Sequence, residues 1–146
     1  MNTWRKWRRL AWPDRWLLVK ALVLVMTFRV GLALFPYRRV VRFVDRTPAG
    51  EAVRYDPARV ARLVRAVARR LLGDRPCLPQ ALAVRYLLHR AGVDTVLHIG
   101  VAKGPARELL AHAWVEYRGR VLIGGESSIH RYVPLRPLTP GRKSAA

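Results

Sequence analysis

The residue with the clearest chemical potential is Cys77, the only cysteine among the 146 residues of the chain. It lies in the proline-rich segment 76–80, just before an apolar run that continues to Gly92. Because proline lacks an N–H, Pro79 fits a helix only within its first turn, so we expect a helix to begin near Cys77. The positive end of a helix stabilises a thiolate, the nucleophilic form of cysteine. The sequence therefore predicts Cys77 as a candidate nucleophile, and the alternative is an inert buried thiol.

A histidine further along the chain has the chemistry of a base for this thiol. Segments 109–117 and 120–124 are apolar, aromatic and β-branched, and they flank a short turn with Gly119, a pattern typical of a β-hairpin. His112 lies on the first predicted strand. A nucleophilic cysteine and its base are often distant in sequence, so Cys77 and His112 together favour catalysis. The alternative is a strand histidine that makes only a local hydrogen bond.

Several motifs in order along the chain resemble the lasso peptide leader peptidases, the transglutaminase-like protease subunits of a split maturation enzyme. The motifs are Cys77-Leu78-Pro79-Gln80-Ala81-Leu82-Ala83, Arg90-Ala91-Gly92-Val93, Leu97-His98-Ile99-Gly100-Val101 and Ala111-His112-Ala113-Trp114-Val115-Glu116, and a hydrophobic N-terminal segment, 16–42, precedes them. In that family a Cys, a His and an Asp cleave a leader peptide from a ribosomally made precursor. The resemblance implies a cysteine protease with Cys77 and His112 as catalytic residues. It also implies an α+β fold with a transglutaminase/papain-like core, in which the catalytic helix packs on a small antiparallel sheet.

The third catalytic residue of the family has no direct counterpart, because the position of its Asp falls on Gly124. If the turn at 118–119 is a type I turn with a G1 bulge, His112 faces Gly124 and Glu126 lies further along the same face. Glu126 is then the predicted orienting residue. A water, a backbone carbonyl or Gln80 are the alternatives. A plain two-residue hairpin would instead point Glu126 away from His112.

Composition divides the chain into three stretches. Residues 1–47 form a basic and hydrophobic helical segment, 48–136 the predicted catalytic domain, and 137–146 a tail of Pro, Gly and small residues that we expect to be flexible. The elements predicted within the second stretch are a helix capped by Asp56 and Pro57 and ending at Gly73, a helix from Cys77 to Gly92, and strands at 95–101, 110–117 and 120–124.

The apolar run 16–35 is long enough to approach a bilayer span, but Lys20 and Arg29 interrupt it on opposite sides of a helix. A charge near mid-membrane is costly, so a simple spanning helix is not favoured. Packing on the catalytic domain, with or without partner docking, is the preferred interpretation. An interfacial helix on an anionic membrane and a docking surface for a partner are the alternatives, and flanking tryptophans and arginines support the membrane.

The remaining composition limits cofactors and partners. A net charge of +19 would attract any polyanion, but no nucleic-acid-binding motif accompanies it, so we expect no specific nucleic acid. The other histidines, His89, His98 and His130, are scattered without ligand spacing, and there is no phosphate-binding loop. We therefore expect no metal and no cofactor. A single cysteine gives no intramolecular disulfide, and we expect a cytoplasmic protein.

The resemblance also implies partners. These are a precursor peptide as substrate, a separate leader-binding protein that presents it, and an ATP-dependent cyclase that then closes the ring. Two other functions stay open on the residues alone. One is acyl transfer to an amine by a transglutaminase-like enzyme on the same Cys-His pair, and the other is a non-catalytic basic scaffold, which the missing Asp would favour.

Overall fold

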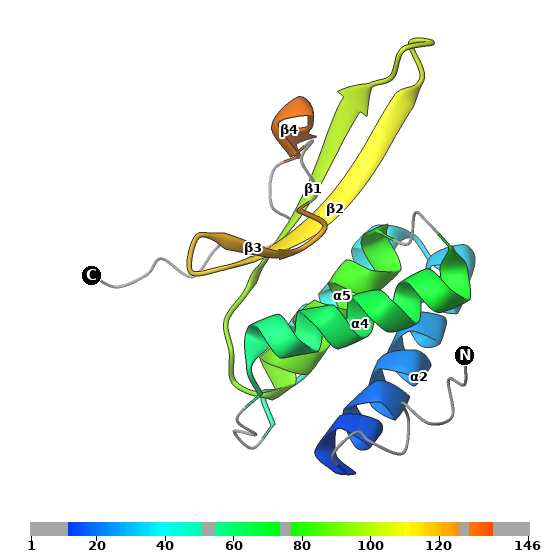
Figure 1. Cartoon of the computed structure of the whole chain (residues 1–146). Helices are drawn as coiled ribbons and strands as arrows, with labels where there is room; N and C mark the ends of the chain where they lie inside the picture. The colour runs from blue at the N-terminus through cyan, green and yellow to red at the C-terminus, as the bar shows by residue number, and fades with distance from the viewer. Residues whose placement is uncertain (1–11, 51–54, 74–76, 126–128, 136–146) are drawn as a thin grey trace, which may run out of the picture.

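The computed structural model describes residues 12–50, 55–73, 77–125 and 129–135. In this part of the chain the α-helices come first and the strands of the sheet follow them (Figure 1). The helices are α2 (Trp12–Leu34), α3 (Tyr37–Arg46), α4 (Pro57–Leu72) and α5 (Cys77–Arg90), and the strands are β1 (Val96–Lys103), β2 (Leu109–Tyr117), β3 (Arg120–Ile123) and β4 (Val133–Pro134), with a 3-10 turn, η1 (Ile129–Arg131), before β4. The fold is α+β, as the sequence predicts. The boundary expected after residue 47 follows α3 directly.

Both helices of the predicted catalytic domain begin and end at the signals in the sequence. The side chain of Asp56 accepts a hydrogen bond from the backbone N–H of Ala58, and α4 ends before Gly73. After α5, the N–H of Gly92 bonds to the carbonyl of His89, and the N–H of Val93 to the carbonyl of Leu88. This pair of backbone hydrogen bonds is a Schellman motif. It needs the positive φ of 73° that glycine adopts at position 92.

The four described strands form one antiparallel sheet in the order β3-β2-β1-β4. β1 pairs along its whole length with β2, from Val96 opposite Glu116 to Lys103 opposite Leu109, and this ribbon extends well past the helices (Figure 1). Strand β4 adds to the free edge of β1, where Gly100 pairs with Pro134. The sequence did not predict η1 or β4, and both matter for the site below.

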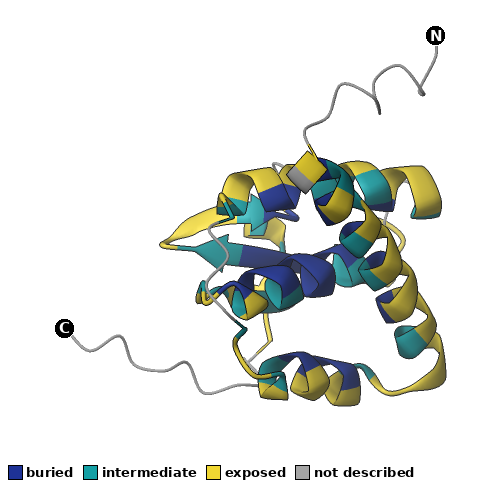
Figure 2. Cartoon of the chain, turned by 90° about the horizontal axis from the view of Figure 1, so that it is seen from below, coloured by how far each residue is buried: buried dark blue, intermediate teal, exposed yellow. Residues whose placement is uncertain are grey.

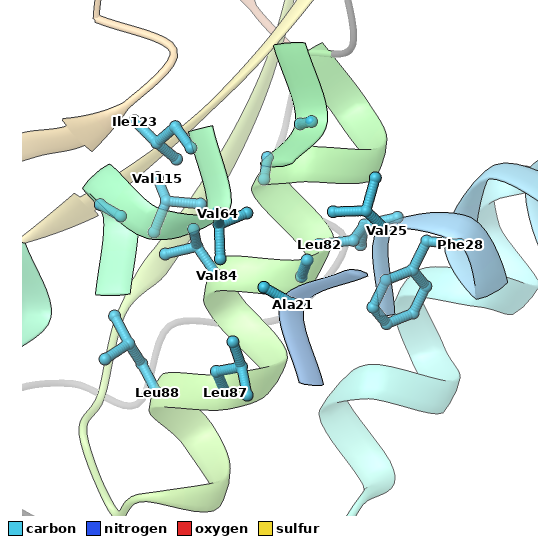
Figure 3. Packing of buried hydrophobic residues seen from close by; sticks show 14 of the residues in the cluster. Ala21, Val25, Phe28, Val64, Leu82, Val84, Leu87, Leu88, Val115 and Ile123 are labelled. Carbon is cyan, nitrogen blue, oxygen red and sulfur yellow. The ribbon is translucent and has the colours of Figure 1, made fainter. Parts of the chain in front are cut away.

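The core lies between the helices and one face of the sheet, and α5 runs through its middle. Leu82 and Leu88 of α5 are fully buried, and truncating such a leucine typically costs about 2–5 kcal/mol. Val115 and Ile123 of the sheet belong to the same cluster as Val64 of α4 and Val84 of α5 (Figure 3). In Figure 2 the buried residues lie on the sides of helices and sheet that face each other, and the exposed residues lie outside.

Helix α2 belongs to this same core through one of its faces. Leu17, Ala21, Val25 and Phe28 are buried, and α2 packs against both α4 and α5. Phe28 also makes an edge contact with Tyr86 of α5, with ring centroids 6.1 Å apart. Packing on the domain, the preferred interpretation of segment 16–35, therefore holds for this face of the helix.

Two ion pairs fix the N-terminal helices on α4 and α5. Arg59 of α4 pairs with Asp14 of α2. Arg85 of α5 donates to Asp45 of α3 through Nε at 2.9 Å and Nη2 at 2.6 Å, and through Nη1 to the carbonyl of Thr95 at 2.6 Å. One guanidinium thus joins α3, α5 and the entry to β1. The side chains of Arg85 and Asp45 are only 15% and 12% exposed, so this pair is largely removed from solvent.

Candidate active site

Cys77 is the first residue of α5, as the sequence predicts. Pro79 is the third residue of the helix, within the turn where no intrahelical N–H bond is lost. The thiol is partly exposed and is not in a disulfide. The free backbone N–H groups of a first turn point along the helix axis toward solvent or ligand. Such a position suits both a thiolate and the negatively charged oxygen that forms when a thiolate attacks a carbonyl.

His112 lies on β2, and a single hydrogen bond recorded in the described structure fixes its ring. Its Nε2 is 2.6 Å from the carbonyl oxygen of Gly124. A carbonyl oxygen only accepts, so Nε2 is the donor, and in the neutral ring Nδ1 is then unprotonated. Thiol peptidases need this arrangement: one ring nitrogen is held by an acceptor while the other is available to take the thiol proton.

Aromatic rings surround the imidazole. The ring centroid of Tyr132, which follows η1, lies 5.0 Å from that of His112, and the ring of Trp114 lies 6.2 Å from it. His98 also stacks on Trp114, with ring centroids 5.2 Å apart. Trp114 is almost completely buried, and its indole N–H donates to Glu116 at 3.2 Å. We call Tyr132, Trp114 and His98 the aromatic wall.

The aromatic wall needs a glycine beneath it. A Cβ at Gly100 would lie 2.9 Å from Cβ of Tyr132 and 3.0 Å from Cζ3 of Trp114. These distances are shorter than normal carbon contacts, so the absence of a side chain at position 100 lets the rings approach β1. Gly100 is also the strand partner of His112, so the ring of His112 projects over the same part of the sheet.

Sequence reasoning missed Tyr132, the ring closest to His112. Nothing at its position marks it as a site residue, since its role arises only when β4 joins the edge of β1 and Leu135 donates to the carbonyl of Ile99 at 2.7 Å. His98 and Trp114 belong to the motifs that carry the family resemblance, but their positions in the sequence do not indicate a role in the site. Nε2 of His98 is within 3.2 Å of a Glu116 oxygen, yet it is out of line for a hydrogen bond and has no other partner in the described structure.

The hairpin that carries the site departs from the predicted turn. Arg118 and Gly119 both have positive φ, 50° and 74°, and Tyr117 pairs with Arg120. The turn is therefore a two-residue type I′ turn, and the predicted type I turn with a G1 bulge is wrong. The extra residue enters later, where the partner of Glu116 is Val121 and the partner of Val115 is Ile123.

This register changes the role expected of position 124. Gly124 has a φ of 79°, and a Cβ there would contact the carbonyl oxygen of Ala113 and lie 2.8 Å from Cβ of Trp114. The predicted placement of a side chain at 124 beside His112 is therefore wrong, because the space next to Gly124 is filled by the backbone of β2. The carbonyl of Gly124, not a side chain, reaches the imidazole.

Among the groups considered as the orienting partner of His112, the backbone carbonyl of Gly124 is the one that contacts the imidazole in the described structure. Gln80 is buried on α5 and makes no recorded hydrogen bond to His112. Glu126 lies outside the described residues, so its predicted role stays a prediction.

Cys77 and His112 stand on elements that contact each other, since α5 packs on β2. Ala113 and Val115 of β2 point into the helical core, so by strand alternation His112 points to the other face of the sheet with Trp114. The structure records no hydrogen bond between the thiol and the imidazole. Both residues occupy the positions that the sequence predicts, and their catalytic pairing stays a prediction.

Comparison with known proteins agrees with this architecture. A family model described as the transglutaminase-like superfamily matches residues 22–137. No curated protein and no solved structure gives a significant match. In the described residues no group of three or more His, Cys, Asp or Glu side chains could hold a metal ion. The family match covers most of the chain, including most of α2, both core helices and the sheet, so the chain belongs to the transglutaminase-like superfamily.

Proposed function

We propose that this protein is a cysteine peptidase that removes the leader peptide from a ribosomally made lasso peptide precursor. The observation that carries the proposal is the state of the two candidate catalytic groups. Cys77 begins α5, and His112 is held through Nε2 so that Nδ1 is available. The superfamily supports thiol-based acyl chemistry, and the motifs shared with lasso peptide leader peptidases support the finer assignment.

In the proposed reaction His112 Nδ1 takes the proton of the Cys77 thiol. The sulfur attacks the scissile carbonyl, and the N–H groups at the start of α5 stabilise the resulting oxyanion. The C–N bond then breaks as the imidazolium gives its proton to the leaving amine, which leaves a thioester on Cys77. Water, deprotonated by the same imidazole, attacks the thioester, releases the leader carboxylate and restores the thiol. Glu126 or the Gly124 carbonyl keeps the ring oriented through these steps.

Proton transfer requires Nδ1 to reach the thiol within hydrogen-bonding distance, directly or through one water. Catalytic hydrogen bonds are often long or poorly aligned without substrate and shorten in the complex. The short hydrogen bond from Nε2 to the carbonyl of Gly124 holds one ring nitrogen in place. The imidazole can therefore move mainly by rotating about that nitrogen. We propose that the precursor peptide, bound at the start of α5, brings the two groups together by moving the hairpin that carries His112 relative to α5, because the imidazole lies on the face of the sheet away from the helical core.

The proposal includes partners. A separate leader-binding protein presents the precursor, an ATP-dependent cyclase follows in the sequence of reactions, and the reaction needs no cofactor in this chain. Cleavage of free precursor should therefore be slow, and the leader-binding protein should accelerate it.

The test is mass spectrometry of candidate precursor peptides incubated with the purified chain, with and without the neighbouring leader-binding protein. Cleavage at one bond, lost in Cys77→Ala, supports the proposal. An excess of a small primary amine in the same reaction tests acyl transfer. A product whose mass shows the amine joined to the leader carboxyl would favour transferase chemistry. Absence of any cleavage with every partner present would favour the non-catalytic scaffold.

A further inference from the structure

Helix α2 has a second apolar face that the domain does not cover. Its buried face carries Leu17, Ala21, Val25 and Phe28, whereas apolar residues on the opposite side are 36% to 70% exposed. We call these exposed residues the α2 stripe: Val19, Leu22, Val23, Met26, Val30 and Leu34. An exposed apolar surface that runs the length of a 23-residue helix is unusual for a soluble monomer and marks an interaction site.

Aromatic residues extend the α2 stripe at both of its ends. Trp12 and Trp16 are exposed at the start of the helix, by 80% and 60%. Phe35 follows its last turn, and Phe43 is exposed on α3. Tryptophan combines an apolar ring with a polar N–H and is favoured where hydrocarbon meets polar headgroups.

Positive charge borders this surface on both sides. Lys20 and Arg29 are nine positions apart, so about 900° of helical rotation places them half a turn from each other, one at each edge of the α2 stripe. Lys20 lies over the ring of Trp16 at 5.9 Å, and Arg39 of α3 over Phe35 at 5.7 Å. Long basic side chains at the edges of an apolar face can keep that face in hydrocarbon while their charges reach lipid phosphates.

Negative charge is turned away from the same surface. The acidic residues of segment 12–50 are Asp14 and Asp45, and each is paired inward with an arginine of a core helix, Arg59 or Arg85. On α3 the exposed basic residues include Arg38, Arg39 and Arg42. The exposed residues of α2 and α3 are therefore mostly apolar or cationic, a combination that is complementary to an anionic bilayer surface.

We propose that the α2 stripe binds the surface of an anionic lipid bilayer, with the helix lying in the plane of the interface. Segment Asp14–Leu34 is long and apolar enough to span a membrane by length and composition. Its inner face, however, is buried against α4 and α5, so a spanning position would expose the core. A helix apolar on its outer face and packed on the domain by its inner face can enter only to the depth of its outer side chains.

The first test is flotation of the full chain with vesicles of phosphatidylcholine alone and of phosphatidylcholine mixed with phosphatidylglycerol. Binding is expected only to the anionic vesicles. Met26→Glu places a charge in the middle of the α2 stripe and should weaken vesicle binding on the order of tenfold. Leu71→Glu on α4 is the matched control, because Leu71 and Met26 are exposed by 41% and 43% and the change in charge is the same. The control should bind as the wild type does.

A second test separates insertion from simple attraction of a basic protein to an anionic surface. In a Cys77→Ala background, Met26→Cys or Leu71→Cys provides the single site for an environment-sensitive fluorophore. Anionic vesicles should shift the emission of the label at position 26 to the blue and leave the label at position 71 unchanged. Equal shifts, or equal loss of binding in both glutamate variants, would overturn the proposal.

Other occupants of this surface give different results. If the wild type does not float with anionic vesicles, the membrane proposal is wrong. If it sediments as a dimer that Met26→Glu converts to a monomer, the surface is an interface between two copies and the proposal is again wrong. Vesicle binding is measured without substrate, so its outcome is independent of the proposed peptidase activity.

Discussion

Nε2 of His112 lies 2.6 Å from the carbonyl oxygen of Gly124, the position where the peptidases that the sequence resembles carry their Asp. A carbonyl can hold the ring and fix its tautomer as a carboxylate does, but it carries no full negative charge to stabilise the imidazolium. A Cys-His site of this kind should therefore retain its geometry and lose part of the electrostatic stabilisation that a carboxylate supplies as the third catalytic residue.

Replacement of Cys77 should remove activity without affecting the fold. Cys77→Ala and Cys77→Ser should each lower turnover by roughly four orders of magnitude or more, because no other thiol is present in the chain. Thermal unfolding followed by circular dichroism should be nearly unchanged, since the side chain is partly exposed. Peptide cleavage by mass spectrometry provides the rate. Full cleavage in either variant would exclude Cys77 as the nucleophile.

The second prediction concerns the pairing of the thiol with His112. His112→Ala should lower turnover about 10²- to 10⁴-fold, the usual contribution of a general base. It should also slow iodoacetamide labelling of Cys77 near neutral pH, because the base that removes the thiol proton is lost. His130→Ala is the control, since His130 is an exposed residue of η1. Identical labelling rates in the two variants would show that His112 does not act on the thiol.

Position 124 gives a test of what orients the ring. Gly124→Asp should destabilise the protein rather than supply the Asp of the peptidases that the sequence resembles, because it combines a positive φ with contacts to the backbone of β2. Gly73→Asp is the matched control. Gly73 has a similar φ, 75°, with nothing within 4 Å of its added Cβ. Backbone strain alone should cost each variant about 1–3 kcal/mol, and urea unfolding should show a larger loss at 124.

A companion variant addresses the predicted acid at position 126. If the Gly124 carbonyl is sufficient to orient His112, Glu126→Gln should leave kcat within about twofold of the wild type. A loss of kcat with unchanged KM would instead identify Glu126 as the orienting carboxylate that the sequence predicts. The two results assign the third member of the site to different groups.

The pair Arg85–Asp45 should be a major source of stability. Arg85→Ala removes both guanidinium hydrogen bonds to the largely buried carboxylate of Asp45, and it removes the hydrogen bond that Arg85 donates to the carbonyl of Thr95. The free energy of unfolding should fall by about 3–5 kcal/mol, as for other buried pairs that lose one partner. Arg62→Ala, at an exposed position of α4, is the control and should change stability by less than about 0.5 kcal/mol. Equal effects would mean that Asp45 is adequately solvated without Arg85.

Local signals were sufficient to predict the helices around the site. The ends of α4 are marked by Asp56, Pro57 and Gly73, and those of α5 by Pro79 and Gly92. Such signals can be read from the sequence because caps and prolines act on the backbone within one turn. The placement of Cys77 at a helix start followed from the same rules. The strand that carries His112 is predicted by the apolar, aromatic and β-branched residues on both sides of the short turn at Gly119.

The register of the hairpin could not be predicted in the same way. Arg118-Gly119 is compatible with a type I turn and a G1 bulge or with a type I′ turn, and the choice depends on packing of β3 against α4. Relative to the predicted pairing, the register shifts by one residue at the turn and by one more between Val115 and Glu116, so a side chain at 124 does not face His112. The contact of Tyr132 with His112 is still less visible in sequence, because a two-residue strand, β4, brings it to the site.

Tyr132 is therefore the last residue to test, as a positioning residue for His112. Its ring packs at 5.0 Å from the imidazole, at an angle of 31°, and limits rotation of the ring about the Gly124 hydrogen bond. Tyr132→Phe retains the ring and should leave kcat nearly unchanged. Tyr132→Ala removes it and should lower kcat roughly tenfold with little change in KM, because the site is looser but substrate binding is retained.

Tyr117→Ala, on the same hairpin as His112 but without a ring contact to it, is the control for lost packing. If Tyr132→Phe is as impaired as Tyr132→Ala, the hydroxyl and not the ring is the functional group; if both are fully active, the bond to Gly124 alone holds His112 in place.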